Sequence, residues 1–338
     1  MHTHRSTQRN TIAIVGGESL LGKEIRDLLD ASDLAANVKL IAADVDSTLI
    51  AAGREEPVVI NSLQMADLGT ARVVILAGSN ESSAKAYEQI QGAKPAPLVI
   101  DMSGSLEENP AARLRVPMLE DEGKKQPAAI TVIPHPAAIA LGLFLKQLRK
   151  AGAIRRSVVE VFEPASERGK AGIDELQKQT VGLLSFKPLP KEVYDAQVSF
   201  NLLPRYGSDS PHSLEEIELK IDRHLASLLA GAGNVPMPSL RLIQAPVFHG
   251  YSLSVWVEFE NNPGREAIVQ AITLPRIDLR AKDEEPPTNV GVAGQSGIAV
   301  GAITADRNEP RAFWFWVVTD NLLISAENAM EVTRELLQ

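Results

Sequence analysis

The stretch that most constrains the fold of this 338-residue chain runs from Thr131 to Leu148. A short β-branched run, Thr131 to Ile133, is typical of a strand and ends at Pro134-His135-Pro136. The apolar run that follows, Ala137 to Leu145, predicts a buried helix. Pro136 suits the first position of that helix, where its missing N–H would have no intrahelical partner. An enzyme of this layout would keep its nucleophile at such a junction, yet the turn offers none.

Composition excludes several classes of site and partner. The chain has no cysteine, which excludes disulfides, thiolate metal sites and cysteine nucleophiles, and its six histidines show no ligand spacing that predicts a metal. A net charge of -9 argues against nucleic acid or an anionic membrane surface as a partner. No run of about 18 apolar residues is present to span a bilayer. The first ten residues lack the apolar core of a signal peptide, so we expect a flexible tail over residues 1–10 and a cytoplasmic protein.

A glycine-rich turn joins a predicted strand, Thr11 to Gly16, to an amphipathic helix, Ser19 to Leu29. Glycines at such a turn let the backbone approach a phosphate, with the helix N–H groups directed at it. The candidate cofactor residues are Gly16, Glu18, Ser19, Leu20, Leu21 and Gly22. The alternative is a bare strand-to-helix turn, and Glu18 favours it, since a carboxylate in the first helical turn would already satisfy the positive helix end.

The strand and helix pattern then repeats and predicts a parallel sheet with crossover helices. Further strands are predicted at Val38 to Ala43, Val73 to Ala77 and Leu98 to Asp101, with a helix at Ser82 to Gln91. Asp44 or Asp46, after the second strand, could bond an adenosine ribose, or either could be a solvated loop acid. No arginine follows to receive a 2′-phosphate, so NAD is favoured over NADP if either binds.

The second half of the chain predicts an α+β domain with a mostly antiparallel sheet. Strands are predicted at Arg156 to Phe162, Leu240 to Val247, Ser252 to Phe259, Gly297 to Ala302 and Phe313 to Val318. Helices are predicted at Ile173 to Leu183, Ser213 to Leu229, after Asn262-Pro263, and at Asn321 to Leu337. Such a sheet needs one face covered, and a partner subunit is a natural cover.

Five separated segments together resemble the aspartate-semialdehyde dehydrogenase family, including its USG-type paralogues. Gly16 to Gly22 is similar to the family's GATGxVG, and Ser166 to Leu176 (SERGKAGIDEL) to its SGAGKAGIEEL. Phe200 to Pro204 (FNLLP) resembles FNxIP, Ala245 to Ser252 (APVFHGYS) resembles VPVxxGHS, and Trp316 to Leu322 (WVVTDNL) resembles WVVSDNL. The order and spacing of these segments extend the resemblance from Ile12 to Leu337.

The resemblance implies a Rossmann-like dinucleotide domain, 11–134 with 320–338, and a substrate-binding and dimerisation domain, 135–319. It places Asn321 among the cofactor residues. In this family a cysteine attacks an aldehyde, a histidine moves protons, hydride passes to the nicotinamide and phosphate resolves the thioester.

The residues that would perform these steps are replaced in this chain. By the resemblance, Pro136 stands at the cysteine and Tyr251 at the histidine, and a phenol of pKa about 10 is a poor base at neutral pH. Glu163 replaces the glutamine that orients the substrate, and Glu107 replaces an arginine that would hold phosphate. These replacements indicate that the dehydrogenase reaction has been lost.

Two further positions complete the substrate site that the resemblance implies. Gln244 replaces the arginine that clamps the substrate carboxylate, while Lys220 corresponds to the family's phosphate-side lysine. Taken together, the changes at Glu107, Gln244 and Glu163 make the predicted cleft about four charges more negative if both carboxylates ionise. An anionic substrate is then disfavoured by charge as well as by the missing nucleophile.

Three interpretations follow from the sequence. The favoured one is a catalytically degenerate homodimer that retains the scaffold and a possible nicotinamide dinucleotide site. The second is an active oxidoreductase of altered chemistry that uses Tyr251, His249 or His135 as a proton donor to a different substrate. The third is a non-enzymatic interaction protein that binds no nucleotide.

Overall fold

A computed structural model describes residues 10–43, 49–51, 58–63, 68–120, 128–231 and 233–338. The chain divides into two compact units, residues 1–134 with 325–338 and residues 135–324. The last helix, α7 (Asn321–Leu337), begins in the second unit and ends in the first. We call them the N-terminal unit and the middle unit and describe each separately.

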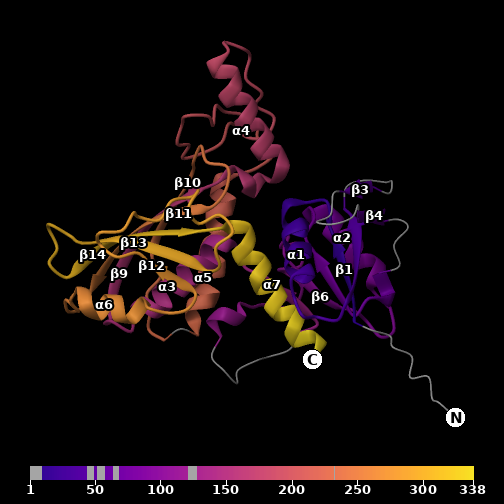
Figure 1. The fold of residues 1–338 in the computed structure, drawn as a ribbon, viewed down its shortest axis with the longest axis horizontal. Coiled ribbons are helices and arrows are strands. Elements are labelled where there is room, and N and C mark those ends of the chain that lie inside the picture. The colour runs from indigo at the N-terminus through magenta and orange to yellow at the C-terminus, as the bar shows by residue number, and fades with distance from the viewer. Residues whose placement is uncertain (1–9, 44–48, 52–57, 64–67, 121–127, 232) are drawn as a thin grey trace. The chain divides into compact units, whose positions relative to one another are not determined.

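The N-terminal unit is built on an eight-stranded sheet that is parallel except for one edge pair (Figure 1). Its order is β3 (Leu49–Ala51), β4 (Val58–Ser62), β2 (Asn37–Ala42), β1 (Thr11–Val15), β5 (Val73–Leu76), β6 (Leu98–Asp101), β8 (Ile130–Val132) and β7 (Ala112–Leu114). Only β3 and β4 pair antiparallel. The connecting helices include α1 (Leu20–Asp30) and α2 (Asn80–Ile90).

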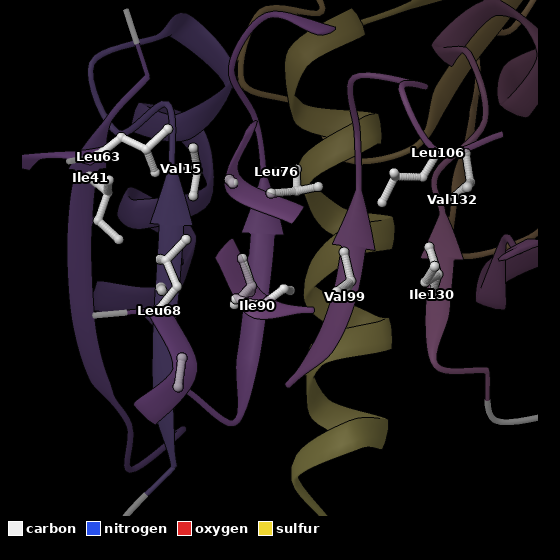
Figure 2. Close-up of a cluster of buried hydrophobic side chains, with 14 residues drawn as sticks. Val15, Ile41, Leu63, Leu68, Leu76, Ile90, Val99, Leu106, Ile130 and Val132 are labelled. Carbon is white, nitrogen blue, oxygen red and sulfur yellow. The ribbon is translucent and has the colours of Figure 1, made fainter. Parts of the chain in front are cut away.

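The parallel arrangement of this sheet accounts for the apolar sequences of its central strands. The central strands read as continuous apolar runs because parallel strands are covered on both faces. Figure 2 shows one layer of this core, in which Val15, Ile41, Leu76, Val99 and Val132 lie side by side across five strands. The same view shows α7 behind the strands. Its last residues are tied to the unit, because Arg72 Nη2 donates to the Leu336 carbonyl at 2.9 Å and Arg115 pairs with Glu335 at 3.0 Å.

The middle unit contains a six-stranded sheet that is antiparallel at its centre and parallel at both edges. Its order is β10 (Ser239–Gln244), β9 (Ile154–Glu163), β11 (Tyr251–Phe259), β14 (Ala312–Thr319), β13 (Ile298–Ala305) and β12 (Ile277–Leu279). Its helices are α3 (Pro136–Leu148), α4 (Gly169–Leu184), α5 (Leu214–Ala230) and α6 (Arg265–Ile272). Figure 1 shows α4 projecting away from the sheet, whereas α3, α5 and α6 lie along it.

The two faces of this second sheet differ in burial. Val159, Val255 and Val317 point to the helix side and are fully buried. On the opposite face Val158 and Trp314 remain 44% and 40% exposed. All of α3 except Lys146 is buried, as its uninterrupted apolar sequence predicts. One face of the sheet is therefore covered by helices and the other is left open within a single chain.

The predicted fold class is confirmed, with small corrections at element ends. The strand predicted to reach Val247 ends at Gln244, before Pro246. The helix expected after Asn262-Pro263 begins at Arg265, and Asn262 accepts a bond from the Gly264 N–H rather than capping the helix itself. Within the described residues, no helix combines the length and the apolar character needed to cross a bilayer.

Candidate functional site

The turn between β8 and α3 holds Pro136 as the first, buried residue of the helix. His135 is the N-cap, and its Nδ1 accepts a hydrogen bond from the Ala137 N–H at 3.3 Å. The His135 backbone N–H in turn donates to His224 Nδ1 at 2.8 Å. The head of α3 is thus capped by an imidazole and carries a proline ring where a nucleophile would stand.

Tyr251 and Glu163 meet beside this turn. Glu163 ends β9 and Tyr251 begins β11, and both side chains are fully buried. The Tyr251 hydroxyl donates to Glu163 Oε2 at 3.2 Å and lies 3.4 Å from His135 Nε2. Burial, and then the nearby carboxylates of Glu163 and Glu167, raise the pKa of Tyr251 well above 10. The phenol therefore stays protonated and acts as a donor to Glu163.

Arg168 completes this group, and sequence reasoning missed it. Its Nη2 donates to Glu163 Oε1 at 3.1 Å, and the Tyr206 hydroxyl donates to the same oxygen at 3.1 Å. The guanidinium is largely buried and always charged, so the charge of Glu163 is matched. The predicted excess of negative charge is therefore offset at this position. A signal was available, since Glu167 and Arg168 stand where the SGAGKAG pattern has glycine and alanine.

Glu167 is the second charged residue in that segment. Its Oε1 accepts from Asn321 Nδ2 at 2.6 Å, and its Oε2 lies 3.6 Å from His135 Nε2. Burial, and then the charge of Glu163, raise the pKa of Glu167 to about 7. Burial also lowers the pKa of His135 well below its ordinary value, helped by the positive charge of Lys220. At neutral pH the imidazole is neutral and Glu167 is part protonated.

The remaining predicted residues of the middle unit have structural partners or lie near this group. Gln244 is fully buried; its Nε2 donates to the carbonyls of Glu163 and Ala245, each at 2.9 Å. Its Oε1 lies 2.8 Å from the Tyr206 hydroxyl, which shares its single proton between Gln244 and Glu163, so the Gln244 amide is occupied by the protein. Lys220, half-buried on α5, acts on Glu167 and His135 through its charge.

We call this group the buried polar cluster. It comprises His135, Glu163, Glu167, Arg168, Tyr206, Gln244, Tyr251 and Asn321. Asn321 was expected among the cofactor residues; here it is the first residue of α7, and its Oδ1 accepts from the Gly250 N–H at 2.9 Å. His249, the other candidate proton donor, is exposed.

Glu107 belongs to the N-terminal unit and follows β6. The preceding turn is organised by Asp101, whose Oδ1 accepts from the Ser103 N–H at 2.9 Å and whose Oδ2 accepts from the Leu106 N–H at 2.8 Å. Glu107 is half-buried at the end of this turn. The structure thus brings Pro136, Tyr251 and Glu163 together in one unit and assigns Glu107 to the other.

The glycine-rich turn lies at the carboxyl end of β1 in the N-terminal unit. Ser19 is the N-cap of α1: its Oγ accepts from the Gly22 N–H at 2.8 Å and donates to the Ala77 carbonyl at 2.9 Å. Leu20 and Leu21 open the helix, so their N–H groups have no carbonyl one turn earlier. Gly16 has a φ of 88°, a conformation that favours glycine. The turn keeps the geometry of an anion site at a helix start.

Glu18 makes a different contact from the one predicted from the sequence. It was expected to satisfy the positive end of α1, but Ser19 performs that role. The Glu18 carboxylate instead accepts from the Ala43 N–H at 2.8 Å, just after β2. The objection that Glu18 raised against nucleotide binding is therefore removed. Asp44 and Asp46, the predicted ribose acids, lie outside the described residues.

No group of three or more histidine, aspartate or glutamate side chains is placed to hold a metal ion in the part of the chain that the structure describes.

Comparison with known proteins adds independent observations. Residues 145–324 match the protein family described as "Semialdehyde dehydrogenase, dimerisation domain". The chain is 27% identical to an aspartate-semialdehyde dehydrogenase of Rickettsia bellii, covering 98% of this chain and 99% of the relative. It is 28% identical to a USG-1 protein homolog of Pseudomonas aeruginosa, covering 98% of each.

Solved structures agree with these sequence matches. A probable aspartate-semialdehyde dehydrogenase from Pseudomonas aeruginosa superposes with a TM-score of 0.86 at 26% identity, covering 97% of this chain and 98% of that one. An aspartate semialdehyde dehydrogenase from Candida albicans, solved with NADP, gives a TM-score of 0.68 at 16% identity over 97% and 98% of the two chains. The second likeness concerns the fold alone.

Proposed function

Because the chain belongs to the semialdehyde dehydrogenase family, we propose that it is a catalytically degenerate homodimeric member that still binds a nicotinamide dinucleotide. The observation that carries the proposal is the head of α3. Pro136 is buried there and has no nucleophilic atom, and Tyr251 beside it is a protonated donor to Glu163. Neither residue can form or release a covalent intermediate.

The buried polar cluster supports the loss of turnover independently. Glu163, Tyr206 and Gln244 bond to one another or to the backbone, and Arg168 pairs with Glu163. A substrate that used these groups would have to displace buried hydrogen bonds and a buried ion pair. Breaking such a pair costs on the order of 3–5 kcal/mol. The polar groups therefore act as internal structure and do not form an open clamp.

The turn after β1 supports retention of the cofactor site. Leu20 and Leu21 would direct their N–H groups at a pyrophosphate, and Gly16 lets the backbone approach it. A bound nicotinamide dinucleotide would supply a hydride acceptor or donor. The NADP named with the Candida albicans structure belongs to that protein and serves here as support by analogy. We favour NAD for this chain.

The open face of the middle unit's sheet supports the homodimer. This face contains all three tryptophans of the chain, Trp256, Trp314 and Trp316, together with Val158. A second copy of the same face would cover it through a two-fold contact, and the matched family is described as a dimerisation domain. We expect Trp314→Glu to yield monomers by light scattering. The control Val59→Glu, on an exposed position of β4 in the other unit, leaves the mass unchanged.

The contacts argue against two of the three candidate proton donors, Tyr251 and His135, and the third, His249, is exposed outside the buried polar cluster. A proton donor for altered chemistry would need access to substrate. Tyr251 and His135 are buried against each other, and the ring of His135 is already a helix cap. The hypothesis of an interaction protein that binds no nucleotide was based on Glu18 as the residue that satisfies the start of α1. The Glu18 carboxylate instead bonds to the Ala43 N–H at the end of β2.

The test measures turnover in the wild type and in a repaired variant. With aspartate semialdehyde, phosphate and NAD or NADP, we expect no reduced cofactor from the wild-type protein. The double variant P136C/Y251H restores the thiol and the imidazole of the family pattern, and we expect it to stay inactive, because Glu107, Gln244 and the Glu163–Arg168 pair remain. Wild-type turnover would overturn the proposal, and activity in the double variant would refute the role given to the remaining residues.

A further inference from the structure

The glycine-rich turn is bonded to the end of β2 as well as to α1. The N–H groups of Gly16 and Gly17 both donate to the Ile41 carbonyl, at 2.8 and 3.0 Å. Gly17 packs so closely that a Cβ there would lie 3.0 Å from the Leu40 Cβ. These contacts hold the turn against the second strand and determine where the next side chain can reach.

That next side chain is Glu18. Its Oε1 accepts the Ala43 N–H at 2.8 Å, so the carboxylate lies at the carboxyl end of β2. β2 runs parallel to β1, with Val15 opposite Ile41. An acidic group has therefore been placed at the end of the second strand by the loop that follows the first.

In a dinucleotide-binding fold, the residue at this position selects between NAD and NADP. The adenosine ribose lies at the end of the second strand, where an acid suits the 2′-hydroxyl of NAD and an arginine suits the 2′-phosphate of NADP. A carboxylate held there repels a phosphate, because like charges at short separation destabilise each other. The hydrogen bond to Ala43 places the Glu18 carboxylate at this position.

We propose that Glu18 is the residue that excludes NADP from this protein and makes it selective for NAD. The inference rests on the proposed dinucleotide binding and specifies which cofactor is accepted. Glu18 acts through its charge at the end of β2, while the pyrophosphate is left to the start of α1. The two roles are therefore separable by mutation.

The experiment titrates the full-length protein with NADH and with NADPH, each by calorimetry. For the wild type we expect NADH to bind at least about tenfold more tightly than NADPH. Glu18→Gln keeps an oxygen for the Ala43 N–H and removes only the charge, so we expect its affinity for NADPH to rise and the ratio to narrow to within about threefold. Glu88→Gln, which changes an exposed acid in the last turn of α2 of the same unit, is the matched control and should leave the ratio unchanged.

The outcomes distinguish the role of Glu18 from the proposed binding of a dinucleotide. If the wild type discriminates and E18Q leaves the ratio unchanged, or if E88Q narrows the ratio as much as E18Q does, the role of Glu18 is overturned while dinucleotide binding stands. Equal binding of both nucleotides by the wild type also overturns the inference alone. If the wild type binds neither nucleotide at millimolar concentration, the cofactor proposal itself fails and the role of Glu18 fails with it.

Discussion

The glycine-rich turn of the N-terminal unit and the buried polar cluster of the middle unit have diverged from the family pattern to different degrees. The turn keeps the first and last glycines of the family's GATGxVG, with Ser19 as the N-cap in place of the middle one, and packs tightly against neighbouring strands. The cluster, which lies next to Pro136, has a tyrosine and two glutamates at positions where the family pattern has other residues, and it bonds mainly to itself. One region is built from closely packed backbone, whereas the other is built from polar side chains that bond to one another.

Packing explains part of this difference. A Cβ at Gly16 would lie 2.5 Å from the Gly78 nitrogen, and one at Gly22 would lie 2.1 Å from the Gly16 oxygen. These glycines are needed for folding whether or not a ligand binds, so their presence alone says little about the cofactor. Catalytic residues have no comparable structural duty and can be exchanged once turnover is no longer required. The case for nucleotide binding therefore depends on Leu20, Leu21 and Glu18.

The largest effect is expected on removing the cation of the cluster. Arg168→Ala leaves the fully buried Glu163 without its paired charge, and we expect the free energy of unfolding of the middle unit to fall by about 3–5 kcal/mol. All three tryptophans belong to this unit, so urea unfolding followed by tryptophan fluorescence measures it.

The double variant E163Q/R168M is the control for that experiment. It removes both charges at similar volume, and we expect it to recover most of the lost stability. If R168A alone costs less than about 1 kcal/mol, the pair is solvated and the picture of a filled site is wrong.

The next effect concerns pH. Because the pKa of Glu167 is raised from 4.5 to about 7, its stabilising, protonated form is fully present below pH 4.5. Its contribution is lost as pH rises from 4.5 to 7. Glu167→Gln stays neutral and keeps an acceptor for Asn321, so above pH 7 it should be more stable than the wild type by up to about 3 kcal/mol. Near pH 4.5 the two proteins should be equal.

Only the difference between the two stability curves isolates Glu167, because His135 is present in both proteins. Burial lowers the pKa of His135 in the folded protein. The stabilising contribution of the neutral imidazole is therefore present above the ordinary pKa of histidine and is lost as the pH falls toward the lowered pKa. The control Glu81→Gln changes an exposed residue whose pKa is lowered by its hydrogen bond to Lys85. It should leave the slope between pH 5 and 7.5 unchanged, and an identical slope in E167Q would contradict the assignment.

The smallest effect is expected in the glycine-rich turn of the N-terminal unit. Gly22→Ala forces a methyl group against the Gly16 carbonyl, and we expect a loss of about 1–3 kcal/mol in the N-terminal unit. Faster amide hydrogen exchange in α1 and β1 would report it. Gly231→Ala, which meets no atom within 4 Å, is the control with little expected change. Unchanged exchange in G22A would mean that the turn is looser than described.

Much of the fold could be predicted because its long elements carry strong periodic signals. The apolar run of α3 and the bounds of α7 match the expectation closely. Short strands escaped prediction because three to five residues carry too little periodicity to show. They are β3, β4, β7 and β12.

The site was harder to predict because its key contacts join residues distant in sequence. The positions of Pro136, Tyr251 and Glu163 could be taken from motifs, but their mutual hydrogen bonds required coordinates. Arg168 was harder to predict because it replaces a small residue of the family pattern and not a catalytic group. The direction of the Glu18 side chain likewise depends on how the turn packs against β2.

Helix α7 has a consequence for how the protein is made. Residues 325–338 complete the N-terminal unit, where Leu336 and Glu335 bond to Arg72 and Arg115. On the ribosome, residues 1–134 emerge early but cannot finish folding until residues 325–338 have been synthesised, whereas residues 135–324 are all synthesised sooner. A stop codon just after residue 324 would therefore harm the N-terminal unit more than the middle unit.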